Sequence, residues 1–434
     1  MLKSDSREIE PGDVFITLAG HKHDGHDFIE EAIRNGASRI IAERGEYDVE
    51  TMIVASTYEY LNEYLHDNIP NIKIIGVTGT NGKTTTCYLI WKICELLSIP
   101  CAYIGTLGFF LGDKKVELKN TTPGLLELYQ FILESHEAGC QYIVMEVSSQ
   151  ALSEGRVAFI DFDYAIFTNL TQDHLDYHIT MESYLEAKKQ LFEQVKKDGI
   201  SILNQDDPCS SYFQLGNYVT YGYSESDYQL EGENLSFSIN EEEYHMKLLG
   251  KYNIYNMSAA ICFFYQLGFN HEELKEVIIL CDSPEGRLDV IEHNTNKIII
   301  DYAHTPDALS NVLDCVAGIP HNKIITIVGC GGDRDKTKRP IMGDIATKKS
   351  DLVIFTSDNP RSEDPEEILN DITKSLDISN YKIESSRENA IKKGIQSLTN
   401  NDILMVLGKG HEKYQIIGNE RFFFDDKKIV LDNL

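Results

Sequence analysis

A glycine-rich segment within the first fifth of the chain has the residue types of a phosphate-binding site. Residues 72–77 are an apolar run that predicts a buried strand, and Gly79-Thr80-Asn81-Gly82-Lys83-Thr84-Thr85 follows it closely. Backbone N–H groups in such a turn, and the positive end of the helix that begins after it, favour an anion. Lys83 adds a positive charge for terminal phosphates, and the Thr84 hydroxyl can hold Mg²⁺. The segment therefore predicts a nucleotide site rather than an ordinary turn.

Polar clusters follow two further strands in a way that suits metal ions. Glu146 lies at the end of the apolar run 142–147, so its carboxylate is expected at the crevice where α/β sheets bind ligands, within reach of nucleotide-bound Mg²⁺. Residues 171–178 contain two Asp and two His after the strand 164–170, which fits either a metal cluster or a helix N-cap with a solvated face. Beside a Mg-nucleotide, we expect His174 to bind a second metal ion.

Two predicted helices carry further candidate side chains. The helix that opens at residue 250 places Asn253 and Asn256 one turn apart on one face. Amides so placed suit the edge of an adenine, and the alternative is simple helix capping. The helix 181–195 carries Lys188 and Lys189, which the sequence alone predicts as solvated cations.

Each strand predicted in the last third of the chain ends in a polar or glycine-rich cluster. The strands are residues 297–300, 324–328, 352–355 and 403–407, and the clusters are residues 301–304, 329–334, 357–361 and 408–412. Such loops at one sheet edge describe a pocket that faces the nucleotide. Arg334 and Arg361 can grip a carboxylate and Glu412 can take an ammonium, which suits the far end of a diamino dicarboxylate. The alternative is that Arg361 caps a turn or pairs with Glu363 or Asp364.

Strands and helices alternate along the whole chain, which predicts an α/β protein. At 434 residues there is room for about three domains. We expect a small N-terminal α/β domain at residues 1–70, a central domain with a mainly parallel sheet at 71–285, and a Rossmann-like C-terminal domain at 286–434.

Composition excludes several classes of function. A net charge of −29 argues against binding to nucleic acid or to an anionic membrane. Nine cysteines without a C-x-x-C pair suggest neither a zinc site nor a disulfide framework, so we expect reduced thiols in a cytoplasm. The first residues lack an apolar signal segment, and no window approaches ~18 uninterrupted apolar residues, so we expect neither export nor membrane insertion.

The motifs taken together resemble the Mur ligases, the ATP-dependent amide-forming enzymes of peptidoglycan synthesis. The resemblance extends along essentially the whole chain and is carried by residues 79–85, 146–149, 169–176, 253–256, 286–287 and 301–304. Residues 5–7, 120–123, 331–336, 358–361 and 408–412 are most similar to the members that add a diamino acid.

The resemblance implies a reaction. ATP would phosphorylate a D-glutamyl carboxylate of UDP-N-acetylmuramoyl-L-alanyl-D-glutamate, and the amine of meso-2,6-diaminopimelate would attack the acyl phosphate. Arg361 is similar to the residue of the diaminopimelate-adding members. Alternatives are a paralogue that uses another carboxylate in a secondary-metabolite or capsule pathway, and a non-catalytic nucleotide-binding protein. We expect a monomer that acts on small-molecule substrates.

The resemblance also implies a role for each motif residue. Lys83, His174 and Lys188 would be catalytic, with Thr84 and Glu146 on one Mg²⁺ and His174 on a second. Lys188 would join the second ion after CO₂ converts its amine to an anionic carbamate. Besides the turn 79–85, the ATP contacts would be Asn253, Asn256, Arg287 and Asp301. The muramoyl dipeptide would contact Ser6, Thr121, Thr122, Ser149, Arg156 and His178, and the amino acid would contact Arg334, Asp358, Asn359, Arg361, Gly408 and Glu412.

Overall fold

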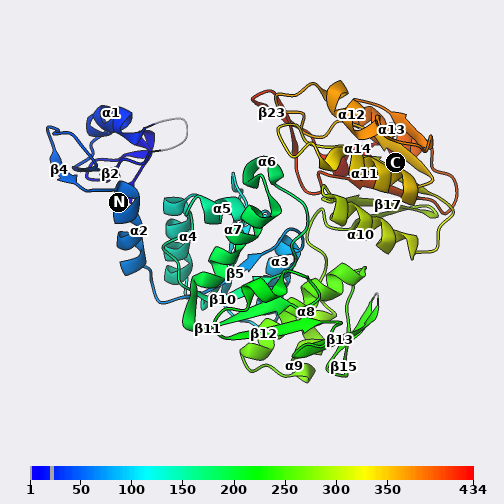
Figure 1. Cartoon of the computed structure of the whole chain (residues 1–434), viewed down its shortest axis with the longest axis horizontal. Helices are drawn as coiled ribbons and strands as arrows, with labels where there is room; N and C mark the ends of the chain where they lie inside the picture. The colour runs from blue at the N-terminus through cyan, green and yellow to red at the C-terminus, as the bar shows by residue number, and fades with distance from the viewer. Residues whose placement is uncertain (1, 20–23, 234) are drawn as a thin grey trace.

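The computed structural model describes residues 2–19, 24–233 and 235–434, and these form three α/β domains, as predicted (Figure 1). The N-terminal and C-terminal domains lie on opposite sides of the molecule, and the central domain lies between and below them in this view. No helix in the described part of the chain has both the length and the apolar character needed to cross a membrane.

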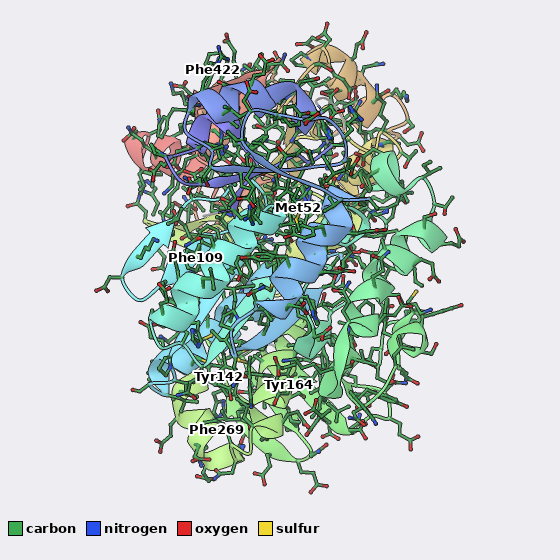
Figure 2. The ribbon with its side chains drawn as sticks, turned by 90° about the vertical axis from the view of Figure 1, so that its left-hand side faces the viewer. Met52, Phe109, Tyr142, Tyr164, Phe269 and Phe422 are labelled. Atoms are coloured by element: carbon green, nitrogen blue, oxygen red, sulfur yellow. The ribbon has the colours of Figure 1, made fainter. Side chains whose placement is uncertain are left out.

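The N-terminal domain is a small parallel sheet in the order β1-β2-β3-β4. Its elements are β1 (Leu2–Lys3), η1 (Ser6–Glu8), β2 (Val14–Ile16), η2 (Gly25–Phe28), α1 (Ile29–Arg34), β3 (Arg39–Ala42), β4 (Glu50–Ile53) and α2 (Thr57–Asp67). Strand β4 is an edge strand whose Met52 is exposed (Figure 2). Helix α2 buries Leu61 and Leu65 in a core shared with the central domain, so it joins the two domains by packing as well as by sequence.

The central domain is built on one long sheet in the order β15-β14-β13-β12-β11-β10-β5-β9-β6-β7-β8. Its elements are β5 (Lys73–Thr78), α3 (Lys83–Leu96), β6 (Cys101–Gly105), β7 (Gly108–Leu111), β8 (Lys114–Val116), α4 (Leu125–Glu137), β9 (Tyr142–Glu146), α5 (Ser149–Ser153), β10 (Phe162–Phe167), α6 (Leu175–His178), α7 (Met181–Glu193), β11 (Val195–Asn204), η3 (Ser210–Phe213), β12 (Tyr218–Gly222), β13 (Tyr228–Glu233), β14 (Ser236–Ile239), β15 (Glu242–His245), α8 (Lys251–Gln266) and α9 (His271–Ile278).

The middle strands of this sheet are parallel, as predicted, whereas antiparallel hairpins extend it at both edges. The pairings place the strand ends that carry the candidate site side by side. Val77 of β5 is the register partner of Glu146 of β9, and Thr78 is the partner of Phe167 of β10. The turn after β5, Glu146, and the loop after β10 therefore meet at one edge of the sheet.

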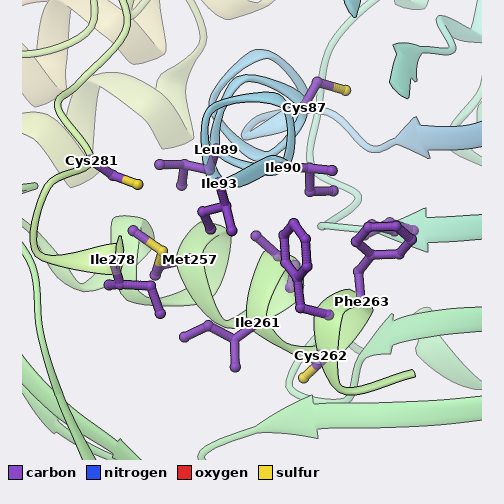
Figure 3. Packing of buried hydrophobic residues seen from close by; sticks show 14 of the residues in the cluster. Cys87, Leu89, Ile90, Ile93, Met257, Ile261, Cys262, Phe263, Ile278 and Cys281 are labelled. Atoms are coloured by element: carbon purple, nitrogen blue, oxygen red, sulfur yellow. The ribbon is translucent and has the colours of Figure 1, made fainter. Parts of the chain in front are cut away.

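Two helices on one face of the sheet hold the candidate nucleotide residues together. Leu89, Ile90 and Ile93 of α3 lie against the buried apolar face of α8, which includes Met257 and Ile261 (Figure 3). Apolar residues at this spacing fall on one side of a helix, and burying each side chain stabilises the pair by about 1.5 to 3 kcal/mol. This core fixes the start of α3, which carries Lys83 and Thr84, against the start of α8.

The C-terminal domain is a Rossmann-like sheet in the order β16-β17-β21-β18-β19-β20, parallel except for the edge strand β16. Its elements are β16 (Asp289–His293), β17 (Asn296–Asp301), α10 (Pro306–Ala317), β18 (Ile324–Val328), α11 (Lys338–Lys349), β19 (Leu352–Phe355), α12 (Pro365–Thr373), β20 (Tyr381–Ile383), α13 (Arg387–Gln396), β21 (Ile403–Leu407), β22 (Tyr414–Ile417), β23 (Glu420–Phe423) and α14 (Asp426–Asp432). Register pairs Asp301 with Leu407 and Val328 with Phe355, so the four predicted loops share one edge.

Candidate active site

The predicted phosphate turn has a backbone conformation that requires glycine at two of its positions. Gly82 has φ +88°, and a Cβ there would approach Asn256 Oδ1 to 2.4 Å. A Cβ at Gly79 would approach Thr168 Oγ1 to 1.9 Å, so neither position has room for a side chain. Helix α3 begins at Lys83, whose Nζ donates to the carbonyls of Gly79 and Thr80 at 2.8 Å each. The turn thus presents a helix N-terminus and an ammonium at one place.

Glu146 and Thr84 form a paired oxygen site beside this turn. The Thr84 hydroxyl donates to Glu146 Oε2 at 2.9 Å, and Tyr103 and the Thr106 backbone N–H donate to Oε1 at 2.7 and 2.8 Å. Glu146 is fully buried. Hard oxygen donors next to a phosphate cradle suit Mg²⁺, which shares its coordination with phosphates and water. Among the described residues no cluster of three or more His, Cys, Asp or Glu forms a metal cage, so such an ion would depend on those shared ligands.

His174 lies close to this site in the left-handed conformation, with φ +56°, just before α6. Its Nδ1 lies 3.3 Å from Gln150 Nε2, and its Nε2 lies 3.4 Å from Asp173 Oδ2. Burial lowers the pKa of His174 to about 3. The ring is therefore neutral at physiological pH, which is the form that can ligate a metal ion.

Lys188 is not the solvated helix cation that the sequence alone predicts. Only 1% of it is exposed, and its Nζ donates to the carbonyl of Gly79 at 2.8 Å, the same oxygen that Lys83 contacts. No carboxylate pairs with it among the described residues, and its Nζ lies over the ring of Tyr184, 4.5 Å from the ring centroid. Burial, reinforced by the charge of Lys83, holds the pKa of Lys188 well below its ordinary value. Helix α7 therefore points this amine into the site.

A cavity of about 330 Å³ lies between the central and C-terminal domains, and its lining includes the ATP contacts predicted outside the turn. These are Asn253, Asn256, Arg287 and Asp301. Asn256 donates to Asn253 Oδ1 at 3.1 Å, so the two amides share one face of α8 as predicted. Asp301 accepts from the backbone N–H groups of Leu288 and Ala303, and Arg287 donates to Thr84 Oγ1 at 3.2 Å. The cavity thus leads directly to the phosphate turn.

The predicted dipeptide contacts divide into those that line a cavity and those that lie behind the lining. Thr121, Ser149 and Arg156 line the cavities next to the turn. Thr122 is buried and donates to the carbonyl of Glu146 at 2.9 Å, and His178 Nε2 lies 2.9 Å from Ser149 Oγ. The structure places these two as supports for the residues that line the cavity.

Ser6 lies outside these cavities, in the N-terminal domain. Its hydroxyl is buried and donates to Glu31 Oε2 at 2.6 Å. Its contact with a substrate stays a prediction.

The predicted amino-acid residues surround a cavity of about 460 Å³. The lining from the C-terminal domain includes Arg334, Asp358, Asn359, Arg361, Gly408 and Glu412, and it faces Thr121, Arg156 and His174 of the central domain. This shared lining brings the two halves of the predicted site together.

Arg361 donates to two backbone carbonyls, those of Gly332 and Asn359, which is the turn-cap alternative, and among the described residues it forms no ion pair with Glu363 or Asp364. Its Nη1 donates to the carbonyl of Gly332 at 2.8 Å, while Glu363 is bound by Arg339 and Lys336. Burial lowers the pKa of Arg361, and the neighbouring charge of Arg334 lowers it further. The guanidinium groups of Arg334 and Arg361 line the same cavity and repel each other. An anion bound between them would remove this repulsion.

Tyr302 is a site residue whose importance the sequence did not reveal. It lines both the nucleotide cavity and the amino-acid cavity. The guanidinium of Arg287 lies 4.5 Å over its ring, and its hydroxyl lies 3.5 Å from Glu412 Oε1. Its position directly after a strand end was the one signal in the sequence that could have marked it as a site residue. The contact with Glu412 could not be predicted, because the two residues are more than a hundred positions apart in the sequence.

The fold and the site define the class: an α/β protein in which a glycine-rich turn typical of nucleotide binding faces a Rossmann-like sheet across a shared cavity. Models of the Mur ligase family catalytic domain, the Mur ligase middle domain and the Mur ligase glutamate ligase domain match residues 1–79, 77–264 and 286–410. The chain belongs to the Mur ligase family.

Individual relatives cover nearly the whole chain. The UDP-N-acetylmuramoyl-L-alanyl-D-glutamate–2,6-diaminopimelate ligase of Fusobacterium nucleatum is 41% identical over 99% of this chain and 92% of its own length. The enzyme of the same name from Clostridium perfringens is 40% identical over 100% and 94%. A solved structure with that name is 32% identical with a TM-score of 0.68, covering 100% of this chain and 94% of its own. The MurF ligase from Thermotoga maritima in complex with ADP shares the fold at 19% identity, with a TM-score of 0.70 over 100% and 96% of the two chains.

We predict that Lys83→Ala lowers turnover by ~10²-fold or more, the usual loss for a preorganised charge contact. The measurement is phosphate release from ATP in the presence of both other substrates. Lys92→Ala, on the same helix but paired with Glu95 at the surface, is the matched control and should retain wild-type turnover. Near-normal turnover in Lys83→Ala would show that the turn does not act on phosphate.

Proposed function

We propose that this chain is an ATP-dependent ligase that joins meso-2,6-diaminopimelate to a D-glutamyl carboxylate of UDP-N-acetylmuramoyl-L-alanyl-D-glutamate, in peptidoglycan synthesis. The observation that carries the proposal is the 460 Å³ cavity, in which Arg361 and Glu412 face Thr121 and Arg156 across the domain boundary. An acceptor carboxylate held by the central domain and an amine held by the C-terminal domain would meet there. The names and full-length coverage of the relatives support the same substrates.

The residues of the turn would do the phosphoryl-transfer part of the reaction. Lys83 and the N-terminus of α3 would hold the terminal phosphates. Arg287 lies beside them, because its guanidinium donates to Thr84 Oγ1. Phosphoryl transfer is catalysed mostly by positioning and by neutralising charge. The carboxylate oxygen attacks the γ-phosphorus, ADP leaves, and the amine then displaces phosphate from the acyl carbon.

The donor set around the turn fits two magnesium ions. Thr84 and Glu146 would hold one, and His174 with Lys188 would hold the other, where bound Mg²⁺ would neutralise charge on the phosphate oxygens. An ammonium at Lys188 would repel that second cation, whereas a carbamate formed when the amine adds CO₂ would bind it as an anionic oxygen ligand. We therefore assign Lys188 as a carbamylated ligand.

We further propose that the enzyme acts in the cytoplasm and as a monomer. All nine cysteines are free, which fits a reducing compartment, and each group that the reaction requires belongs to one chain.

The Lys188 assignment predicts chemical rescue. Lys188→Ala should lose activity and regain part of it when short carboxylic acids are added, because a free carboxylate can occupy the position of the carbamate. Lys189→Ala is the matched control, since its side chain is more exposed and lies near Glu186 and Glu193 on the same helix. Loss of activity without rescue at any acid concentration, together with density for an unmodified amine in crystals grown with Mg-nucleotide, would contradict the carbamate.

The choice of amino acid predicts a specificity change at Arg361. The wild type should release phosphate only with the UDP-dipeptide and an amino acid present, and should prefer meso-diaminopimelate to L-lysine by ~10⁴-fold or more in kcat/KM, because L-lysine leaves the guanidinium unpaired. Arg361→Ala should lose most of that preference. Arg361→Lys keeps the charge without the two-pronged geometry, and should fall between the two. Equal use of both amino acids by the wild type, or an unchanged preference in Arg361→Ala, would contradict the assignment.

A further inference from the structure

A buried lysine lies directly behind the amino-acid cavity. Lys409 is 0% exposed and is absent from the residues that line the 460 Å³ cavity. Its Nζ donates to Asn359 Oδ1 at 3.1 Å and to Glu412 Oε2 at 3.1 Å. Asn359 Nδ2 in turn donates to Glu412 Oε2 at 3.0 Å, which closes a triangle of three side chains. Burying an ammonium is costly unless it is paired, and here both partners are residues of the predicted amino-acid site.

The ammonium and a backbone N–H together fix the orientation of the Asn359 amide. An ammonium only donates hydrogen bonds, so the amide atom beside it must be the oxygen. The Ile416 backbone N–H donates to the same oxygen at 2.9 Å, so this oxygen already accepts two hydrogen bonds. One N–H of Asn359 is used by Glu412, and the other remains as a donor for a ligand. Asn359 can therefore contact a carboxylate of the ligand but not its ammonium.

The same contacts give the two carboxylate oxygens of Glu412 different hydrogen-bond partners. Oε2 accepts from both Lys409 and Asn359, whereas within the described part of the chain Oε1 has only the long 3.5 Å contact with the Tyr302 hydroxyl. Oε1 is therefore the atom that can accept from a ligand ammonium. Together with Arg334 and Arg361, this arrangement offers donors for one carboxylate and an acceptor for the adjacent ammonium.

We infer that Lys409 is a positioning residue that sets the polarity of the amino-acid site by holding Asn359 as a donor and Glu412 Oε1 as an acceptor. It acts without touching the ligand. The inference rests on the proposed function, because it assigns that polarity to the diaminopimelate end that carries both a carboxylate and an ammonium.

The test compares Lys409→Met with a neighbouring lysine. Lys409→Met should raise KM for meso-diaminopimelate by about 10- to 100-fold, by analogy with the loss when the hydrogen-bonded partner of a metal ligand is removed, with KM for ATP within about 2-fold of wild type. Lys409→Gln keeps a donor at this position and should show a smaller rise. Lys413→Met, whose half-exposed side chain pairs with Glu285, should leave all constants unchanged. A Lys409→Met KM for meso-diaminopimelate equal to wild type, or an equal rise in KM for ATP, would overturn the inference.

A double-mutant cycle separates positioning from general loss of structure. If Lys409 acts through Glu412, the pair Lys409→Met with Glu412→Gln should have nearly the same KM as Glu412→Gln alone, whereas independent roles would give additive changes. Additivity would overturn the inference. The wild type is measured first: no diaminopimelate-dependent phosphate release contradicts the proposed function itself, while normal wild-type turnover with unchanged KM in the Lys409 variants contradicts this inference alone.

Discussion

The hydrogen bonds to the buried carboxylate of Glu146 hold the site together. Its two oxygens accept from Thr84 at the start of α3, from Tyr103 of β6 and from Thr106 in the following turn. Its backbone carbonyl accepts from Thr122. A buried carboxylate is tolerated only when donors replace its water, and these donors come from separate segments of the chain. The phosphate turn, the strand end and the loop that carries the predicted dipeptide contacts are therefore fixed relative to one another through a single residue.

The second requirement is that the C-terminal domain docks against this site. Asn81 of the turn donates to Asp307 at 2.8 Å, and Asp173 forms a buried ion pair with Lys338 at 3.0 Å. Each cavity of the site is lined by both domains, so neither domain can assemble the site alone. Interfaces that are polar and built around ligands allow domain movement. Closing such an interface excludes water, which would otherwise hydrolyse an acyl phosphate.

Local sequence predicted those parts of the molecule that depend on local chemistry. The parallel strands, the glycine turn and the paired amides of Asn253 and Asn256 follow from apolar runs and from spacing within one turn. The antiparallel strands β13 to β15 were missed because they are short, and their outward-facing residues are polar and break the apolar run. The burial of Lys188 was missed because it depends on Gly79, more than a hundred residues earlier. Lys409 was missed for the same reason, since Asn359 lies on a different strand end.

The central claim is that ATP activates a carboxylate of the acceptor, and the transfer of oxygen tests it directly. The wild-type enzyme is supplied with UDP-N-acetylmuramoyl-L-alanyl-D-glutamate labelled with ¹⁸O in its D-glutamyl carboxylates, together with ATP and meso-diaminopimelate, and the released phosphate is analysed by mass. Formation and aminolysis of an acyl phosphate transfers one carboxylate oxygen to each phosphate. The account predicts phosphate that carries one ¹⁸O atom per turnover. Phosphate released at the same rate without ¹⁸O would contradict it.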